Sequence, residues 1–135
     1  MLQTWIFLNQ RQFWTQPRIE AFLGSVSDEQ MLCLDLDGNE QWNSERLKYG
    51  HGPYMIADGM IFTAGDFLET EKVIALDLAG RFLWETPNGD AWLRSSPGAR
   101  ATPTWDDGKL YHMNPVGRLA SFDARTGREL WALNL

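Results

Sequence analysis

The chain has 135 residues, 44% of them hydrophobic and 13% aromatic, with seven tryptophans and a formal net charge of −6. This composition is that of one modest globular domain and excludes a disordered chain. No run of Lys and Arg exceeds two residues, so the concentrated positive charge that a nucleic-acid partner requires is absent, and we expect no nucleic-acid binding.

Cysteine content and hydropathy set two further limits. The single cysteine, Cys33, rules out an internal disulfide and a cysteine-based metal cage, and its apolar neighbours predict a small buried side chain. The longest apolar run near the start, 5–8, is too short for a secretory signal, and no stretch of about 20 apolar residues is present to cross a bilayer. We therefore expect no membrane span.

Residues 1–18 do not match the repeat that follows them. Trp5, Ile6, Phe7 and Trp14 make this segment apolar enough to pack against a sheet. An outer strand, a short helix and the product of a misplaced start site all fit the pattern, and the sequence does not decide among them.

From residue 19 onward one pattern occurs three times. An alternating apolar stretch ends at Asp, a Gly follows after two or three further residues, and a Trp lies four positions beyond the Gly. The glycines stand at 38, 80 and 127, which are 42 and 47 residues apart, a period typical of β-propeller blades. Asp can cap a tight turn and Gly can take its positive φ. The repeated residues are Asp35, Gly38 and Trp42, then Asp77, Gly80 and Trp84, then Asp123, Gly127 and Trp131.

Two Asp-Gly pairs, Asp58 with Gly59 and Asp107 with Gly108, precede the second and third motifs. Asp-Gly between apolar runs is typical of a two-residue β-hairpin turn, in which both central residues have positive φ. The second and third units therefore read as four strands each, and the first, which lacks such a pair, as three. The expected strands are 19–23, 31–36 and 40–43, then 53–57, 60–65, 72–78 and 81–86, then 101–105, 109–113, 117–123 and 128–134.

The motif resembles the repeat of the quinoprotein-like (PQQ-like) β-propellers, in which a pattern close to Ala-x-Asp-x-x-Thr-Gly-x-x-x-Trp recurs once per blade. The third unit matches it with Ser121 in the Ala place and with Asp123, Thr126, Gly127 and Trp131. The other two units match with one residue fewer before Gly. The likeness is nearest to the group that includes the outer-membrane assembly lipoprotein. It implies an all-β partial propeller of about three four-stranded antiparallel blades, at 19–48, 49–92 and 93–135, with each Trp docking blade to blade.

The sequence contains no recognisable catalytic, cofactor or metal site. The segment 35–40 is acidic, but its Gly falls at position four, whereas a calcium-binding EF-hand loop needs it at position six. His51 and Arg100 lie in loops that lead into the innermost strands of two units, and we single them out as candidates for residues that face the axial channel. His112 is expected to be an ordinary strand residue.

These observations favour a non-catalytic repeat module that holds no cofactor and binds a protein partner or further blades. The alternative is a fragment of a PQQ-dependent alcohol dehydrogenase, for which the resemblance implies a quinone with calcium, an active-site Asp and often adjacent cysteines. A sensor part of a larger receptor is a third reading. The resemblance also implies the periplasm or cell envelope for a full-length parent.

The repeat also predicts how the blades pack. Trp84 and Trp131 should be mostly buried between sheets, with Trp42 docking likewise if the first unit is ordered. Closed propellers use about four to eight blades, and an arc of three has two uncovered faces. Because the chain also stops on an apolar strand, we expect that it self-associates through its blade faces or is a piece of a longer protein.

Overall fold

The computed structural model describes residues 53–94 and 99–135 with their side chains and, within residues 5–43, the backbone of five strands together with Asn39. The described residues form thirteen strands and no helix. The strands are β1 Trp5–Leu8, β2 Arg11–Gln16, β3 Ala21–Ser27, β4 Gln30–Asp35, β5 Glu40–Asn43, β6 Met55–Ala57, β7 Met60–Phe67, β8 Thr70–Asp77, β9 Phe82–Asp90, β10 Thr104–Asp106, β11 Lys109–Met113, β12 Arg118–Asp123 and β13 Glu129–Asn134.

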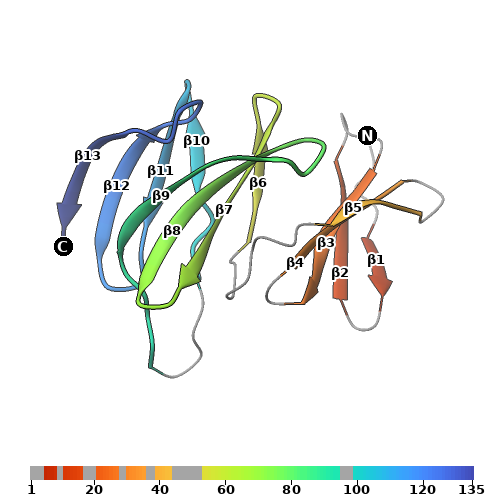
Figure 1. The fold of residues 1–135 in the computed structure, drawn as a ribbon, viewed down its shortest axis with the longest axis horizontal. Coiled ribbons are helices and arrows are strands. Elements are labelled where there is room, and N and C mark those ends of the chain that lie inside the picture. Colours follow the sequence, from red (N-terminus) through yellow and green to blue (C-terminus); the bar gives the residue numbers. More distant parts are fainter. Residues whose placement is uncertain are drawn as a thin grey trace.

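These strands build three sheets in which strand order follows chain order. β1–β5 form a five-stranded sheet, β6–β9 a four-stranded sheet and β10–β13 a second four-stranded sheet. Every pair of neighbouring strands is antiparallel. Figure 1 shows the three sheets in a row, in chain order, as successive blades. The all-β class and the partial propeller of antiparallel blades are therefore confirmed.

The first sheet contains two strands whose structure the sequence left open. β1 and β2 come from the segment 1–18 and continue the sheet outward from β3, with Trp14 opposite Leu23 and Trp5 opposite Trp14. The aromatic and β-branched residues of β1 and β2 are types that are enriched in strands, and the pairing of β2 with β3 satisfies backbone groups. The first sheet therefore has five strands, two of which, Trp5–Leu8 and Arg11–Gln16, come from the segment 1–18.

The two predicted hairpin turns are confirmed. Asp58 and Gly59 join β6 to β7 with φ of 49° and 74°, and Asp107 and Gly108 join β10 to β11 with φ of 44° and 75°. Positive φ at both central residues defines the type I′ turn, whose twist matches that of the flanking strands. The predicted strands of these two blades are also present, although β9 extends to Asp90, beyond the predicted end at 86, because it follows the long β8 as far as Thr70.

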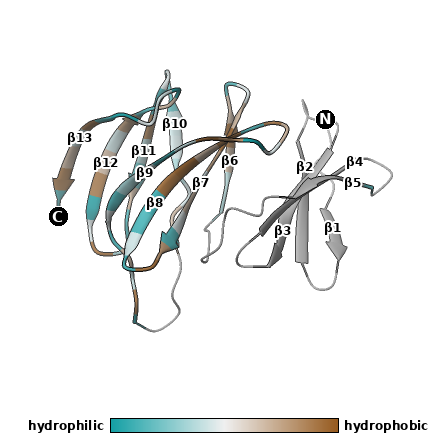
Figure 2. Ribbon diagram, in the orientation of Figure 1, coloured by the Kyte–Doolittle hydropathy of each residue, from teal (hydrophilic) through white to brown (hydrophobic). Residues whose placement is uncertain are grey.

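The main core lies between the middle and last sheets. Successive strand residues point to opposite faces, so the apolar run on β8, coloured brown in Figure 2, supplies both faces of the middle sheet. One face packs on the last sheet and the other is buried around Ile61, Ile74 and Leu76. The core between the two sheets contains Met60, Phe62, Val73, Ala75, Trp84, Leu110, Ala120, Phe122 and Ala124.

Candidate functional site

The motif Asp residues cap the turns at the ends of β8 and β12. Asp77 Oδ1 accepts hydrogen bonds from the N–H groups of Ala79 and Arg81, both at 2.9 Å. Asp123 Oδ1 accepts from the N–H of Thr126 at 2.9 Å and from its hydroxyl at 2.9 Å. The hydrogen bonds from Thr126 hold the pKa of Asp123 below its ordinary value. Burial opposes ionisation of Asp77, but the bonds from Arg81 outweigh it, so the pKa of Asp77 is also lowered.

Trp84 docks on the motif turn of the next blade. Its side chain is 8% exposed, and its Nε1 donates a hydrogen bond to the Ala124 carbonyl at 3.1 Å. The indole lies so close to Gly127 that an added Cβ there would overlap the ring. Thr86 Oγ1 donates to the Gly127 carbonyl at 2.6 Å. Gly127 is therefore required twice, for its φ of 74° and for the approach of Trp84.

The burial predicted for Trp131 is wrong. Its side chain is 42% exposed, and its ring lies 6.1 Å from that of Tyr111. Trp131 occupies on β13 the place that Trp84 occupies on β9, but within the described part of the chain no sheet covers the face from which it projects. The docking of Trp42 lies outside the described side chains.

The sheet face that carries Trp131 exposes a set of apolar side chains. The pairing of β11, β12 and β13 sets Tyr111 opposite Ser121 and Trp131, and Met113 opposite Leu119 and Leu133, so all six lie on one face. Met113 is 47% and Leu133 56% exposed. We call the residues of this face, Tyr111, Met113, Leu119, Ser121, Trp131 and Leu133, the terminal face; Ser121 is its one polar member and is buried.

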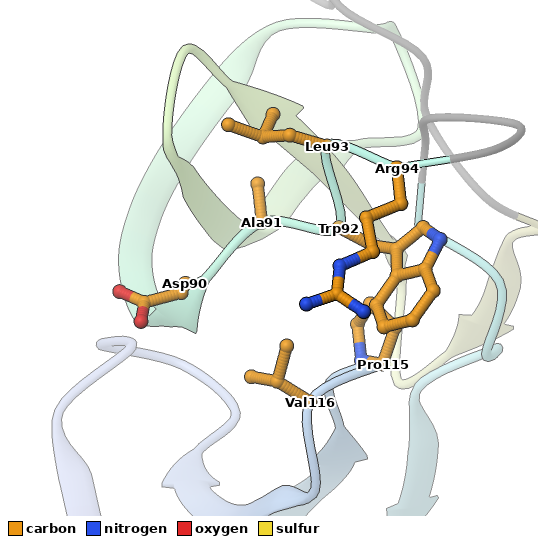
Figure 3. Close-up of a pocket in the computed structure, with 7 residues that line it drawn as sticks. All are labelled: Asp90, Ala91, Trp92, Leu93, Arg94, Pro115 and Val116. Atoms are coloured by element: carbon orange, nitrogen blue, oxygen red, sulfur yellow. The ribbon is translucent and has the colours of Figure 1, made fainter.

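A second candidate site is an open pocket where the middle and last blades meet at one end. It has a volume of about 530 Å³ and is lined by Asp90, Ala91, Trp92, Leu93 and Arg94 at the end of β9 and by Pro115 and Val116 from the β11–β12 turn. Figure 3 shows the Arg94 side chain running beside the Trp92 indole, with Pro115 and Val116 on the adjoining wall. The lining thus combines apolar side chains with one carboxylate, Asp90, and one guanidinium, Arg94.

Two arginines meet the indole of Trp92. The guanidinium carbons of Arg94 and Arg100 lie 5.6 and 5.7 Å from the ring centroid, which is the range of a cation–π contact. Arg100 is exposed, and its guanidinium contacts Trp92, which lines this pocket. Its expected position facing an axial channel stays a prediction. His51, the other predicted channel residue, and the motif residue Gly38 lie outside the described residues.

A polar network that was not predicted from the sequence joins the two blades beside the pocket. Asn114 Nδ2 donates to the Asn88 carbonyl at 2.8 Å, while its Oδ1 accepts from the Arg118 N–H at 2.7 Å. Arg118 in turn donates to Asn88 Oδ1 at 2.7 Å and to Glu129 at 2.8 Å. Both asparagines are buried, so this network fixes the turn that carries Pro115 and Val116.

His112 has a buried partner that sequence spacing could not reveal. Its Nε2 lies 2.7 Å from Glu71 Oε1, and both side chains are fully buried between the two blades. The two residues are 41 positions apart and come from different repeats.

Neither a metal set nor a membrane helix is found in the described ranges. Across 53–94 and 99–135 no group of three or more His, Cys, Asp or Glu side chains is placed to hold a metal ion. In the same described ranges no helix is long and apolar enough to cross a membrane.

The fold is shared with solved propeller proteins. BamB from Moraxella catarrhalis is 20% identical over 86% of this chain and 38% of its own, with a TM-score of 0.64. A europium-containing methanol dehydrogenase is 15% identical over 96% of this chain and 26% of its own, with a TM-score of 0.65. The quinohemoprotein alcohol dehydrogenase from Comamonas testosteroni is 17% identical over 91% of this chain and 20% of its own, at 0.63. The chain thus spans well under half of each of these proteins.

These likenesses define the class of fold. The three sheets have the fold of β-propeller blades and are similar in structure to parts of BamB and of the two dehydrogenases. Such low identity establishes the fold alone, and one fold can host unrelated functions.

Two comparisons by sequence add little. Residues 1–64 match a model of the alpha-N-acetylglucosaminidase (NAGLU) tim-barrel domain, which is less than half of the chain. A TIM barrel has parallel strands alternating with helices, whereas the strands described in this region are antiparallel, so the match does not describe the fold. No curated protein matches the chain by sequence.

Proposed function

We propose that this chain is a non-catalytic PQQ-like propeller module that serves as a protein-interaction scaffold within a larger propeller. The observation that carries the proposal is the pocket at the blade end with its exposed apolar surround. Leu93 and Val116, which line the pocket, are 57% and 48% exposed. Exposed apolar side chains gathered at a concave site are typical of a surface that a partner covers.

Leu68 extends this apolar surround and supports a partner-binding role. The Ala91 N–H donates to the Glu69 carbonyl at 2.9 Å, which holds the β7–β8 turn beside the pocket. In that turn Leu68 has a φ of 58° and is 76% exposed. A leucine in the left-handed region raises the free energy of the fold, and no burial offsets that cost here. Contact with a partner would supply the missing burial.

The charges at the pocket define the chemistry of the partner segment. Arg94 lines the pocket, and the Arg100 guanidinium lies 5.7 Å from the centroid of the Trp92 ring, which also lines it. A guanidinium binds a carboxylate through paired hydrogen bonds. The segment that fits is a peptide with an aromatic or branched apolar side chain, to fill the pocket, next to an Asp or Glu.

Panning a phage-displayed library of short random peptides against the chain tests this proposal. Enriched peptides should pair an apolar side chain with an acidic one. Their affinity should fall roughly tenfold or more in Arg94→Ala, the size of one charge-assisted hydrogen bond, and also in Val116→Asp. Leu83→Asp is the matched control, because Leu83 is 44% exposed on β9 and does not line the pocket. No enrichment, or equal loss in the control, contradicts the proposal.

The larger propeller is supported by the terminal face. The pair formed by Trp84 and Gly127 shows how one blade of this chain receives the next. The terminal face repeats the Trp at position 131 and leaves it exposed, so a further blade with the Asp-x-x-Gly turn fits there. The small share of BamB and of the dehydrogenases that the chain covers agrees with this role.

A quinone-dependent alcohol dehydrogenase is the alternative that the fold permits. Adding PQQ and calcium to the chain tests it directly, with the visible spectrum and dye-linked alcohol oxidation as readouts. We expect neither a saturable spectrum nor activity, and either would overturn the scaffold proposal. An envelope location of the full-length parent is part of the same proposal, and cell fractionation tests it.

A further inference from the structure

Two ionisable side chains meet in the core between the middle and last blades. Glu71 is on β8 and His112 on β11, and Oε1 of the first lies 2.7 Å from Nε2 of the second. The side chains of both are fully buried. Their outer atoms, Glu71 Oε2 and His112 Nδ1, are also buried and have no hydrogen-bond partner within the described part of the chain. Each of these two atoms can therefore accept one more proton.

A further carboxylate faces this pair. Asp66 on β7 lies opposite Glu71 in the strand register, is 5% exposed and repels a negative charge on Glu71. From β9, the neutral Asn88 donates to the His112 carbonyl at 3.4 Å. From β12 the nearest charge is Arg118, whose guanidinium is already bound by Asn88 and Glu129.

The neighbouring lysine does not neutralise the site. Lys72 follows Glu71 in β8, so its side chain leaves the opposite face of the sheet, where it pairs with Glu85 at 2.7 Å. The buried site thus contains two carboxyl groups and one imidazole.

The number of protons bound in the unfolded and folded chain indicates which protonation state the buried site favours. In the unfolded chain near neutral pH both carboxyl groups are ionised and the imidazole is mostly neutral, since their ordinary pKa values are about 4 and about 6.5. A neutral imidazole could donate its Nε2–H to Glu71, but the buried Glu71 carboxylate would then keep a full negative charge beside a neutral ring. One added proton, on His112 Nδ1 or on Glu71 Oε2, balances that charge.

We propose that the junction between the middle and last blades is a proton-binding site, so that the two blades pack more tightly as the pH falls from about 8 to about 6. Burial raises the pKa of Glu71, with a partial opposite effect from His112 and a further rise from Asp66. A group whose pKa is higher in the folded than in the unfolded chain stabilises the fold fully at pH values below its unfolded-state pKa. This stabilisation is lost as the pH rises through its folded-state pKa. The direction of this shift therefore agrees with the proton count.

Urea unfolding of the chain between pH 6 and pH 8 tests the proposal. Uptake of up to one proton on folding makes the unfolding equilibrium constant rise by up to about tenfold per pH unit. Glu71→Gln keeps the shape but removes the carboxyl group, so its stability should be nearly independent of pH in this range. Glu85→Gln on the opposite face is the control and should keep the slope of the unchanged chain. A flat profile in the unchanged chain, or an equal slope in Glu71→Gln, overturns the proposal.

A second measurement needs no variant and covers the case in which Glu71→Gln fails to fold. The chain is labelled with carbon-13 at the glutamate carboxyl groups and titrated by NMR. The carboxyl and ring signals together report which of the two groups holds the added proton, and that proton should be present at pH 6. An ionised Glu71 beside a neutral His112 throughout the range from pH 6 to pH 8 shows that the pair binds no proton and overturns the proposal.

Discussion

Trp84 and Trp131 occupy the same position in consecutive repeats, and yet 8% of the first and 42% of the second is exposed. The difference lies in the neighbour. Trp84 has the turn at Gly127 against its ring and the Ala124 carbonyl for its N–H, whereas the ring of Trp131 lies beside that of Tyr111 on its own sheet. Trp84 thus stabilises the junction between two blades.

Removing either side of that contact should destabilise the chain. Trp84→Ala should cost about 3–5 kcal/mol, the usual loss for a large aromatic side chain in a core. Gly127→Ala should cost more than Gly108→Ala, because both glycines have positive φ but only Gly127 has an indole within reach of a Cβ. Urea melts of the three variants measure these differences. Equal costs for the two glycine variants would show that the Trp84 contact adds nothing.

Asp123 should make the stability of the last blade sensitive to acid. The hydrogen bonds from Thr126 lower the pKa of Asp123 in the folded chain. The ionised Asp123 therefore stabilises the fold at pH values above the ordinary Asp pKa, and this stabilisation is lost as the pH falls through its folded-state pKa. The unfolding free energy should therefore decline below about pH 4. Asp123→Asn should flatten this decline, as followed by thermal melts from pH 5 to pH 2.5. Asp106→Asn, an exposed Asp on β10, is the control and should keep the decline of the unchanged chain.

At the scale of the strands, local signals determined what could be predicted. Asp107 with Gly108 fixed a hairpin, and β11 has the predicted bounds 109–113, because turn type and strand register follow from neighbouring residues. The pocket and the buried pair were not predicted. Glu71 and His112 lie 41 residues apart, and only the stacking of two blades brings them together. The exposure of Trp131 depends on a neighbouring blade and not on the repeat itself.

The β7–β8 turn is the element in which local preference and structure disagree. Leu68 has positive φ without a glycine's freedom, and its side chain is 76% exposed. Leu68→Asn should leave the chain as stable or stabilise it by up to about 1 kcal/mol, since Asn tolerates the left-handed region better. The same variant should weaken binding of the peptides selected on the pocket. Leu83→Asn, an exposed strand leucine, should not gain stability, and melts with peptide titrations check both. Unchanged peptide binding in Leu68→Asn would exclude this turn from the docking surface.

At the scale of the molecule, the two faces of the last sheet differ in how fully they are covered. The junction between the middle and last sheets combines apolar packing, the docked Trp84 and the network around Asn88. At its far side the terminal face presents Trp131, Met113 and Leu133 to solvent. A contiguous apolar face of this kind is ordinarily covered in repeat proteins by the next repeat or by a capping segment.

The terminal face should therefore drive association of the isolated chain. Sedimentation at micromolar concentration should show mass increasing with concentration, and a hydrophobic dye should bind. Trp131→Glu combined with Leu133→Lys places charge on the face and should give a monomer with reduced dye binding, while the fold persists because neither side chain belongs to the buried core. Leu83→Lys on β9 is the control and should associate as the unchanged chain does. A concentration-independent monomer that binds no dye would mean that the chain is self-sufficient and that the terminal face does not drive association.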